Sequence, residues 1–490
     1  MSTRLLFAAS EMAPWVKTGG LADVIAGLPA ALARMDADVK VLLPGYPALL
    51  EAFPDAPVLA QLSSLGGALP DATLRAATTP EGVGLLILDC PALYARPGNP
   101  YSGPDGAEWP DNALRFGLLA RVAALLASDA TPLAWRPRVL HLHDWQSALA
   151  AAYGHYLYGR IAPTVVTVHN LAFQGKFPHA TLAQLGLPEA AWGIDGVEFY
   201  GDLSFLKGGM QFADWISTVS PTYAREIQTD AEGMGMAGLL RGKSEQLSGI
   251  LNGIDNRVWN PLTDPLLACN YSAAQLPLKA ANKRALQARM GLVPRVDYPL
   301  FAVVSRLTYQ KGLDLLIELE AALTALPAQL VVLGTGERPL EAAFTAMAAR
   351  HPGQMAVAIG FDETLAHLIE AGADSFLMPS RFEPCGLNQM YSLAYGTPPV
   401  VRATGGLADT VIDLPAGAKV AGRANGFVFH EPSAAALLEA ITRAHAAWGK
   451  PALWRQVQKN AMAGSFSWQA SAEAYLALYR RLLTEPTQRA

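Results

Sequence analysis

The stretch RLLFAASEMAPWVKTGGLADVIAGLPAALARM, residues 4–35, has the pattern of a strand, a glycine turn and a helix. Arg4–Ala9 is a short apolar run typical of a buried strand, and Leu21–Met35 has the apolar spacing of a helix. Between them, Gly19 and Gly20 allow the backbone to approach a ligand closely, and a helix that begins there points N–H groups at it. This unit predicts a parallel α/β sheet with an anion site after its first strand.

The hexapeptide TGGLAD occurs twice, at Thr18–Asp23 and at Thr404–Asp409. Each copy follows a strand-like run and leads into a helix-like run. The copies do not indicate a domain duplication, because Lys17 precedes the first and Arg402 and Ala403 precede the second. They also follow strands at different places in their two series. We expect two independent Gly-Gly helix starts that contact one ligand.

Short apolar runs alternate with helical patterns along the first half of the chain. The expected strands are Arg4–Ala9, Val39–Leu43, Leu85–Asp89, Val139–His143, Thr164–His169 and Trp215–Ser220. The expected helices between them include Leu21–Met35, Asn112–Leu126 and Trp145–Tyr158. This alternation is typical of a mostly parallel sheet that is covered on both faces.

A second series of the same kind begins after the turn-rich segment Leu251–Pro261. Its expected strands are Leu300–Ser305, Leu330–Gly334, Met355–Ile359, Ser375–Met378, Pro399–Val401 and Gly426–Phe429, and its expected helices include Leu313–Leu323, Pro339–Ala349 and Ala434–Ala446. We therefore predict two doubly wound, Rossmann-like domains, residues 1–255 and 256–465. A last helix, in residues 466–490, begins near Ser467 and packs either on its own domain or back on the first.

Composition narrows the class of protein. The 490 residues are 51% hydrophobic and 16% charged, with a net charge of −5, which suits large buried cores. The sequence contains no Lys/Arg tract of the kind that binds nucleic acid. It also contains no apolar run that approaches the roughly 18 residues of a membrane span. Three cysteines are too few for a disulfide framework or a zinc site. We expect a soluble cytoplasmic protein.

Polar residues of the first domain collect where strands end, which is where α/β sheets bind ligands. Lys17 precedes the first glycine pair, and His169 and Asn170 end another expected strand. Asp144 directly follows the strand Val139–His143, where it either binds a hydroxyl or caps the next helix. His141 and His143 are spaced to face one side of that strand, but no third ligand follows with clear spacing, so we predict no metal site.

The second domain places a cation pair and a carboxylate at its strand ends. Arg306 and Lys311 flank a strand-to-helix turn. Two fixed cations there would suit a diphosphate, and we favour this interpretation over two solvated surface charges. Glu383 lies in a later turn, followed by Cys385 and Gly386. There it could contact a sugar while N–H groups after Cys385 meet a phosphate. The pattern favours a sugar nucleotide as ligand.

Many long motifs, in one order along nearly the whole chain, resemble those of bacterial glycogen synthases, which are close relatives of plant starch synthases. These motifs are KTGGLAD, RPGNPY (Arg96–Tyr101), HDW (His143–Trp145), TVHNLAFQG (Thr167–Gly175), SPTYAREI (Ser220–Ile227), LNGID (Leu251–Asp255), SRLTYQKGLDL (Ser305–Leu315), PSRFEPCGLNQ (Pro379–Gln389), TGGLADTV and FSW (Phe466–Trp468).

The resemblance implies a GT-B glycosyltransferase, with two Rossmann-like domains that face a central cleft. It implies an acceptor side in residues 1–255, a donor side in 256–465, and a C-terminal helix that crosses back to the first domain. The implied reaction transfers glucose from ADP-glucose to the non-reducing end of glycogen or another α-1,4-glucan, retains the anomeric configuration, and needs neither metal nor cofactor.

The resemblance also assigns roles to residues. Lys17 meets the donor, Asp144 and His169 lie near the transferred glucose and the acceptor, and Arg306 and Lys311 neutralise the diphosphate. Glu383 contacts the glucose and completes the catalytic set. The implied nucleotide-sugar contacts are Gly19, Gly20, Tyr101, Asn170, Asn252, Gly360, Phe361, Cys385, Gly386, Leu387, Asn388, Thr404, Gly405 and Gly406.

Two positions depart from the family pattern. Phe361 stands where relatives can have a tyrosine stacked on adenine, so stacking is kept and a hydroxyl contact is lost. Asn388 stands where some relatives have threonine, which keeps polarity but changes the geometry at the donor.

A retaining glycosidase would use two carboxylates about 5 Å apart, and the motifs contain no obvious pair of that kind. We therefore expect same-face attack, in which the donor phosphate assists deprotonation of the acceptor hydroxyl and Glu383 supports the sugar.

Four alternatives remain at this stage. The first two are a sugar-nucleotide epimerase, which needs no glucan, and a non-catalytic glucan-binding relative. A nicotinamide oxidoreductase is disfavoured because the first turn lacks GxGxxG. A glucan phosphorylase would need a lysine that holds pyridoxal phosphate.

Overall fold

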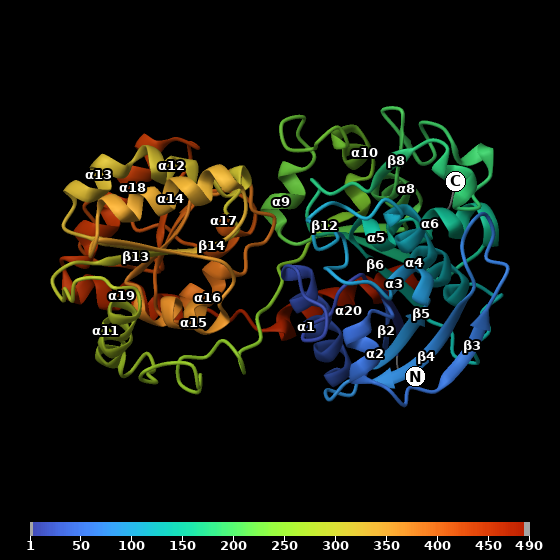
Figure 1. Ribbon diagram of the computed structural model, residues 1–490, viewed down its shortest axis with the longest axis horizontal. Coiled ribbons are helices and arrows are strands. Elements are labelled where there is room, and N and C mark those ends of the chain that lie inside the picture. Colours follow the sequence, from blue (N-terminus) through green and yellow to red (C-terminus); the bar gives the residue numbers. More distant parts are fainter. Residues whose placement is uncertain (1–2, 485–490) are drawn as a thin grey trace. The chain divides into compact units, whose positions relative to one another are not determined.

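Two α/β units account for residues 3–484, the part of the chain that the computed structural model describes (Figure 1). One unit runs up to Gly253 and takes in the chain again from Trp468, and the other is Ile254–Ser467. The limits predicted from the sequence are residues 255 and 465. No helix among residues 3–484 is long and apolar enough to cross a membrane.

A nine-stranded sheet forms the centre of the first unit. From edge to edge its strands are β12 (Leu247–Gly249), β11 (Trp215–Thr218), β7 (Thr164–Val168), β6 (Val139–His143), β1 (Arg4–Ala8), β2 (Asp38–Pro44), β5 (Gly84–Asp89), β4 (Ala72–Thr78) and β3 (Val58–Leu62). The first seven are parallel, and six of them were predicted from their apolar runs, whereas β12 was not. β4 and β3 add antiparallel strands at the other side of the sheet.

The strand order reverses at β1, which pairs with β2 on one side and with β6 on the other. The loops that follow β1 and β6 therefore leave the same edge of the sheet in opposite directions. Such a switch point leaves a crevice outside the carboxyl ends of the strands. Lys17 follows β1 and Asp144 follows β6, so the topology brings these two predicted site residues to one crevice.

The helices of the first unit cover both faces of its sheet. They are α1 (Gly20–Arg34), α2 (Pro47–Ala52), α3 (Pro91–Tyr94), α4 (Asn112–Ala127), α5 (Asp144–Ala148), α6 (Ala150–Tyr153), α7 (Thr181–Gln184), α8 (Phe205–Phe212), α9 (Pro221–Glu226), α10 (Ala237–Gly242) and α20 (Trp468–Thr484). A small sheet lies outside the main one, in the order β8 (Lys176–Pro178), β10 (Asp202–Ser204) and β9 (Glu198–Phe199). The single helix expected at 145–158 is instead α5, α6 and a π-turn at Gly154–Tyr158.

The C-terminal helix α20 packs on the first unit, as the family resemblance implied. It lies beside α1 (Figure 1), and Trp468, Tyr475 and Tyr479 are buried in the same core cluster as the apolar face of α1. The hydroxyl of Tyr479 lies 2.7 Å from His141 Nδ1 in the central strand β6, and His141 Nε2 lies 2.6 Å from Thr167 Oγ1. His141 therefore anchors α20. The other histidine of strand β6, His143, is not used in this contact.

A six-stranded, all-parallel sheet forms the centre of the second unit. Its order is β15 (Met355–Ile359), β14 (Gln329–Gly334), β13 (Leu300–Val304), β16 (Ser375–Met378), β17 (Pro399–Arg402) and β18 (Phe427–Phe429). The order reverses at β13, which pairs with β14 and β16. This second switch point collects the loops that carry Arg306, Lys311 and Glu383.

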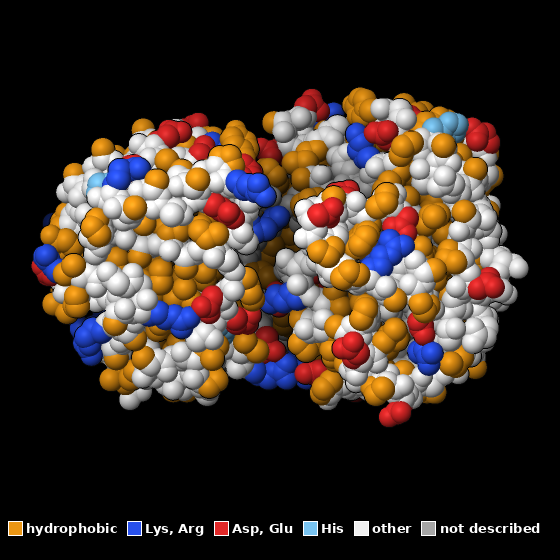
Figure 2. Space-filling view, viewed as in Figure 1, with side chains coloured by type: hydrophobic (Ala, Val, Ile, Leu, Met, Phe, Trp, Pro, Cys, Tyr) orange, Lys and Arg blue, Asp and Glu red, His pale blue; other side chains and the backbone are white. Residues whose placement is uncertain are grey.

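The helices of the second unit are α11 (Lys279–Arg289), α12 (Asp314–Glu318), α13 (Glu320–Ala325), α14 (Arg338–Arg350), α15 (Glu363–Gly372), α16 (Asn388–Ala394), α17 (Gly405–Thr410), α18 (Ala434–Trp448) and α19 (Pro451–Met462). On the face drawn in Figure 2, Lys and Arg side chains are interspersed with Asp and Glu over both units, so neither sign of charge dominates that face.

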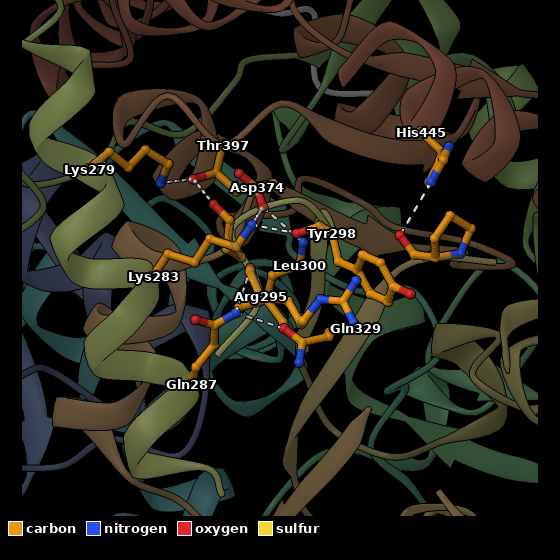
Figure 3. Close-up of polar contacts among 12 residues, drawn as sticks. Lys279, Lys283, Gln287, Arg295, Tyr298, Leu300, Gln329, Asp374, Thr397 and His445 are labelled. Carbon is orange, nitrogen blue, oxygen red and sulfur yellow. Dashed lines mark hydrogen bonds and ion pairs between the residues drawn. The ribbon is translucent and has the colours of Figure 1, made fainter. Parts of the chain in front are cut away.

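Polar side chains of α11 tie this helix to residues next to the starts of several strands (Figure 3). Lys283 Nζ lies 2.7 Å from Asp374 Oδ2, which also accepts the Leu300 N–H at 2.8 Å. Lys279 Nζ donates to Thr397 Oγ1 at 2.7 Å, and burial lowers the pKa of Lys279 to about 7. These contacts satisfy buried polar groups at the edge of the sheet opposite to the switch-point loops, so this edge serves stability.

The close approach of α1 and α20 leads to a prediction about Gly27. A Cβ added there would lie 2.1 Å from Trp468 Nε1, so even alanine must displace the Trp468 ring. We expect Gly27→Ala to lower the free energy of unfolding by about 1–3 kcal/mol, measured by urea denaturation. The control is Gly238→Ala in α10, where nothing lies within 4 Å of the added Cβ. A Gly27→Ala protein as stable as this control would contradict the packing described.

Candidate active site

The loop between β1 and α1 is organised by a buried carboxylate, Glu11. Glu11 is 3% exposed, and its carboxylate accepts the Thr18 N–H at 2.6 Å, the Thr18 hydroxyl at 2.7 Å and the Tyr101 hydroxyl. Met12 and Val16 exchange two backbone hydrogen bonds across the loop. These contacts fix the chain on both sides of Lys17. The sequence analysis did not include Glu11 among the site residues, although an acidic residue between a buried strand and a glycine turn was a usable signal.

Space is open beside Gly19, the first residue of the glycine pair. Gly19 has an extended backbone at the N-cap of α1, and nothing lies within 4 Å of a Cβ placed on it. Lys17 Nζ lies 2.8 Å from Asp23 Oδ1, and the Lys17 side chain is 38% exposed. The start of α1 therefore combines accessible backbone with a partly exposed cation, which is an arrangement that favours anions.

Tyr101 supports this loop from within the unit. Its hydroxyl donates to Glu11 and lies 2.9 Å from Ser10 Oγ, and its ring packs against Phe116 at a centroid distance of 5.9 Å. The hydroxyl is thus engaged by the protein itself. Where the resemblance implies a nucleotide contact, the structure gives Tyr101 a supporting contact with Glu11.

Asp144 joins the ends of two neighbouring strands. It begins α5 with a left-handed φ of 54°, and its carboxylate accepts the His169 N–H at 2.7 Å. It therefore holds the end of β7, a different role from the helix cap considered in the sequence analysis. Asp144 is buried, and loss of solvation raises its pKa to about 7 in spite of the hydrogen bonds it accepts.

A pair of neutral histidines lies at the same strand ends. His143 Nδ1 and His169 Nε2 are 3.0 Å apart. Burial lowers the pKa of His169 to about 3 and the pKa of His143 well below its ordinary value, so neither ring is charged near neutral pH. The Asn170 backbone also hydrogen-bonds to Asp144, and its side-chain oxygen accepts the Ala172 N–H. No hydrogen bond within residues 3–484 joins Asn252 to the histidines.

The second unit holds an ion pair at its switch point. Lys311 Nζ lies 2.6 Å from Glu383 Oε2, and the Ser380 hydroxyl donates to the same oxygen at 2.8 Å. Glu383 is 6% exposed. The exposed guanidinium of Arg306 makes no hydrogen bond or ion pair with any residue that the structure describes. The two cations predicted for a diphosphate are thus brought to one loop, but Lys311 already has an anionic partner.

Arg381 joins the two loops that carry these residues, and the sequence analysis did not single it out. Its guanidinium forms two hydrogen bonds of 2.7 Å with Asp314, and its carbon Cζ lies 3.7 Å from the centre of the Tyr309 ring. Its backbone N–H donates to Gln310 O at 2.8 Å. The position of Lys311 next to Glu383 therefore depends on Arg381.

The second TGGLAD copy has a different physical basis from the first. Gly405 has a φ of 45°, and a Cβ on it would lie 1.9 Å from Glu383 O; on Gly406 the distance to Cys385 O would be 1.8 Å. The Gly406 N–H donates to Glu383 O and Pro384 O. The Gly406 N–H is thus engaged by the backbone of the protein, and this glycine pair packs against residues 383–385.

The remaining predicted residues of the second unit lie near the carboxyl ends of its strands. Asn388 Nδ2 donates to Val304 O at the end of β13, and Leu387 precedes α16. Gly360 follows β15 with a φ of 135°, and Phe361 beside it is 80% exposed. Cys385 is buried, and Gly386 has a φ of 67°. An exposed aromatic face and the Arg306 cation leave this edge able to bind a planar, anionic ligand.

Both halves of the chain match families of known proteins. Residues 4–242 match the family described as "Starch synthase catalytic domain", and residues 288–461 match "Glycosyl transferases group 1". The chain is 58% identical over 479 residues to a glycogen synthase of Dechloromonas aromatica, covering 98% of each protein. It is 52% identical over 485 residues to a glycogen synthase of Nitrosospira multiformis, covering 98% of this chain and 97% of that one.

Two solved structures resemble this one. The catalytic domain of starch synthase IV from Arabidopsis thaliana, bound to ADP and acarbose, matches with a TM-score of 0.86 and 31% identity, covering 99% of this chain and all of that one. A sucrose-phosphate synthase from Thermosynechococcus elongatus matches with a TM-score of 0.58 at 17% identity, which indicates a shared fold only.

The contact between Tyr101 and Glu11 predicts a loss of stability in Tyr101→Phe. The variant keeps the ring and removes one donor from a buried carboxylate, so the free energy of unfolding should fall by about 1–3 kcal/mol in urea denaturation. Tyr46→Phe is the matched control, because the buried Tyr46 hydroxyl has no hydrogen-bond partner within residues 3–484. That control should be neutral or stabilising, and equal effects of the two changes would contradict the role given to Tyr101.

The raised pKa of Asp144 predicts a pH dependence of stability. The folded protein binds this proton more tightly than the unfolded chain, so the contribution to stability is complete below the unfolded pKa of 3.8 and is lost as pH rises through about 7. Asp144→Asn removes the titration and keeps an oxygen for the His169 N–H. Between about pH 5 and about pH 8, wild-type stability should fall by about 3 kcal/mol relative to this variant. Parallel curves of unfolding free energy against pH would contradict the assignment.

Proposed function

We infer the activity of this chain from the premise that it belongs to the family of bacterial glycogen synthases and starch synthases. The chain is a glycosyltransferase that moves glucose from ADP-glucose to the non-reducing end of an α-1,4-glucan and releases ADP. Identity of more than half over nearly the full length, together with the intact Arg306, Lys311 and Glu383 cluster, supports this over a binding protein that has lost its chemistry.

The cluster in the second unit suits departure of ADP. Negative charge grows on the β-phosphate as its bond to the anomeric carbon breaks, and fixed cations lower the barrier where that charge develops. Arg306 has no partner within the described chain and is available for the diphosphate. Lys311 shares its charge between Glu383 and the leaving phosphate. The exposed Phe361 is the proposed stacking surface for adenine.

Glu383 is proposed to position the sugar and not to form a bond to it. One carboxylate oxygen accepts hydrogen bonds from Lys311 and Ser380, which lowers its nucleophilicity. A retaining glycosidase needs a nucleophile and an acid about 5 Å apart. We therefore propose that the acceptor hydroxyl attacks from the side that ADP leaves, and that the leaving phosphate takes its proton.

The first unit is proposed to supply the remaining contacts. Lys17 and the open start of α1 suit the anionic part of the donor. Asp144 and the neutral His169 suit hydroxyl groups of the transferred glucose and the acceptor, since neutral rings and a carboxyl group bind hydroxyls without placing a cation beside the reacting carbon. We place the reaction in the cytoplasm, which agrees with Cys90 and Cys269 as thiols.

One assay tests the proposed function against its alternatives. Purified protein receives ADP-[¹⁴C]glucose or UDP-[¹⁴C]glucose, with and without glycogen, and label in polymer is counted. Label should enter polymer from ADP-glucose only when glycogen is present. Isomerised sugar nucleotide without glycogen would indicate an epimerase, and binding of glycogen without transfer would indicate a glucan-binding protein.

The cation that faces Glu383 gives a quantitative prediction. Lys311→Ala removes preorganised positive charge from the leaving phosphate, so kcat for transfer from ADP-glucose to glycogen should fall by about 10²-fold or more. Lys419→Ala, at an exposed lysine in the loop after α17, is the control and should keep wild-type kcat. Near-normal turnover by Lys311→Ala would show that the diphosphate assignment is wrong.

A further inference from the structure

We propose that His143 is a positioning residue for glucosyl transfer. It holds the ring of His169 so that His169 Nδ1 carries the proton and offers it to a hydroxyl of the sugar. This inference rests on the proposed function and adds a residue that acts through His169. Three observations support the proposal. His143 is buried, only one of its two ring nitrogens has a hydrogen-bond partner in the described chain, and His169 is held by both His143 and Asp144.

The ring of His143 cannot turn away from its neighbour. His143 is 0% exposed, and its ring stacks on Phe7 at a centroid distance of 5.2 Å and lies 4.1 Å from the ring of His141. Its backbone N–H donates to Ser147 Oγ at 2.7 Å, and its carbonyl accepts the Ser147 hydroxyl. A fully buried side chain that packs against the rings of Phe7 and His141 and is held at its backbone presents one fixed edge to His169.

The two ring nitrogens of His143 differ in their partners. Nδ1 lies 3.0 Å from His169 Nε2, whereas Nε2 is buried without a hydrogen-bond partner in the described part of the chain. If His169 donated to His143, the proton of His143 would lie on Nε2 and leave a buried N–H without an acceptor. Orphaned buried N–H groups are rarer in proteins than acceptors with spare lone pairs. The favoured arrangement has His143 Nδ1–H donating to His169 Nε2.

This arrangement fixes the tautomer of His169. A neutral imidazole carries one proton, so a His169 Nε2 that accepts requires the proton on Nδ1. The Asp144 carboxylate holds the backbone of the same residue at 2.7 Å. Neither hydrogen bond uses Nδ1, and Nδ1 is absent from the buried unpartnered atoms of residues 3–484. His169 therefore presents a neutral donor to ligand.

His141 does not share this role. Both of its ring nitrogens are engaged, Nδ1 with Tyr479 and Nε2 with Thr167. Of the two histidines in strand β6, His141 anchors α20 and His143 acts on His169.

Variants at His143 separate positioning from packing. His143→Asn keeps a donor near the Nδ1 position, His143→Gln moves the polar group toward the Nε2 position, and His143→Phe keeps only the ring. We expect kcat of His143→Asn within about fivefold of wild type, and kcat of the other two lower by about ten- to a hundredfold at little-changed KM for ADP-glucose. A His143→Phe or His143→Gln protein with wild-type kcat, or a folded His143→Asn protein as slow as His143→Phe, would overturn the proposal.

A spectroscopic measurement tests the tautomer without reference to activity. Long-range ¹H–¹⁵N NMR on histidine-labelled wild-type protein, with the His169 signals assigned by their loss in His169→Gln, should show a proton on Nδ1 and a bare Nε2. A proton on His169 Nε2 would overturn the proposal, and this result is decisive even if a His143 variant does not fold. Absence of glucosyl transfer by the wild type would refute the proposed function and leave the tautomer measurement valid.

Discussion

The main chain at Glu383 is held so closely by Gly405 and Gly406 that no side chain fits between them. Cβ atoms on these glycines would lie 1.9 Å and 1.8 Å from the carbonyl oxygens of Glu383 and Cys385. This contact fixes the backbone of Glu383, while Lys311 and Ser380 fix its carboxylate. The carboxylate, the lysine and the loop after β13 are therefore positioned as one group, and the chemistry proposed for the second unit depends on that rigidity.

Three buried carboxylates serve the two switch points in three ways. Glu11 gathers neutral donors and shapes the loop that carries Lys17. Glu383 pairs with a lysine, and Asp144 bonds to backbone N–H and has its pKa raised to about 7 by burial. Each carboxylate fixes a loop at a strand end. The carboxylates therefore hold the loops that carry Lys17, His169 and Lys311, and the proposed transfer depends on the positions of these residues.

The sequence predicted the parallel sheets because their strands are buried on both faces and appear as continuous apolar runs. Strand β6 was predicted with the bounds observed, Val139–His143. The antiparallel strands β3 and β4 were missed, because their exposed and buried residues alternate irregularly and β3 is largely exposed. The helix expected at 145–158 is divided in the structure. The α-helix α5 ends at Ala148, α6 begins at Ala150, and a π-helical turn begins at Gly154.

The site was predictable where its residues stand next to a glycine turn or a strand end in the sequence. Arg381 could not be recognised in that way, because its partner Asp314 lies 67 residues away. Glu11 stands between a strand end and a glycine turn, but its contact with Tyr101, 90 residues away, was not predictable. The repeated TGGLAD was correctly predicted to begin two helices. Only the structure distinguishes the first copy, with open space beside Gly19, from the second copy, whose two glycines pack against residues 383–385.

The most direct test of the account is the linkage that the protein makes. Purified protein is incubated with ADP-glucose and a short α-1,4-glucan, and the new anomeric proton is followed by ¹H NMR while released ADP is measured. The account predicts new α-1,4 linkages in a one-to-one ratio with ADP. A new β-linkage, or ADP release matched by free glucose without growth of the glucan, would contradict it.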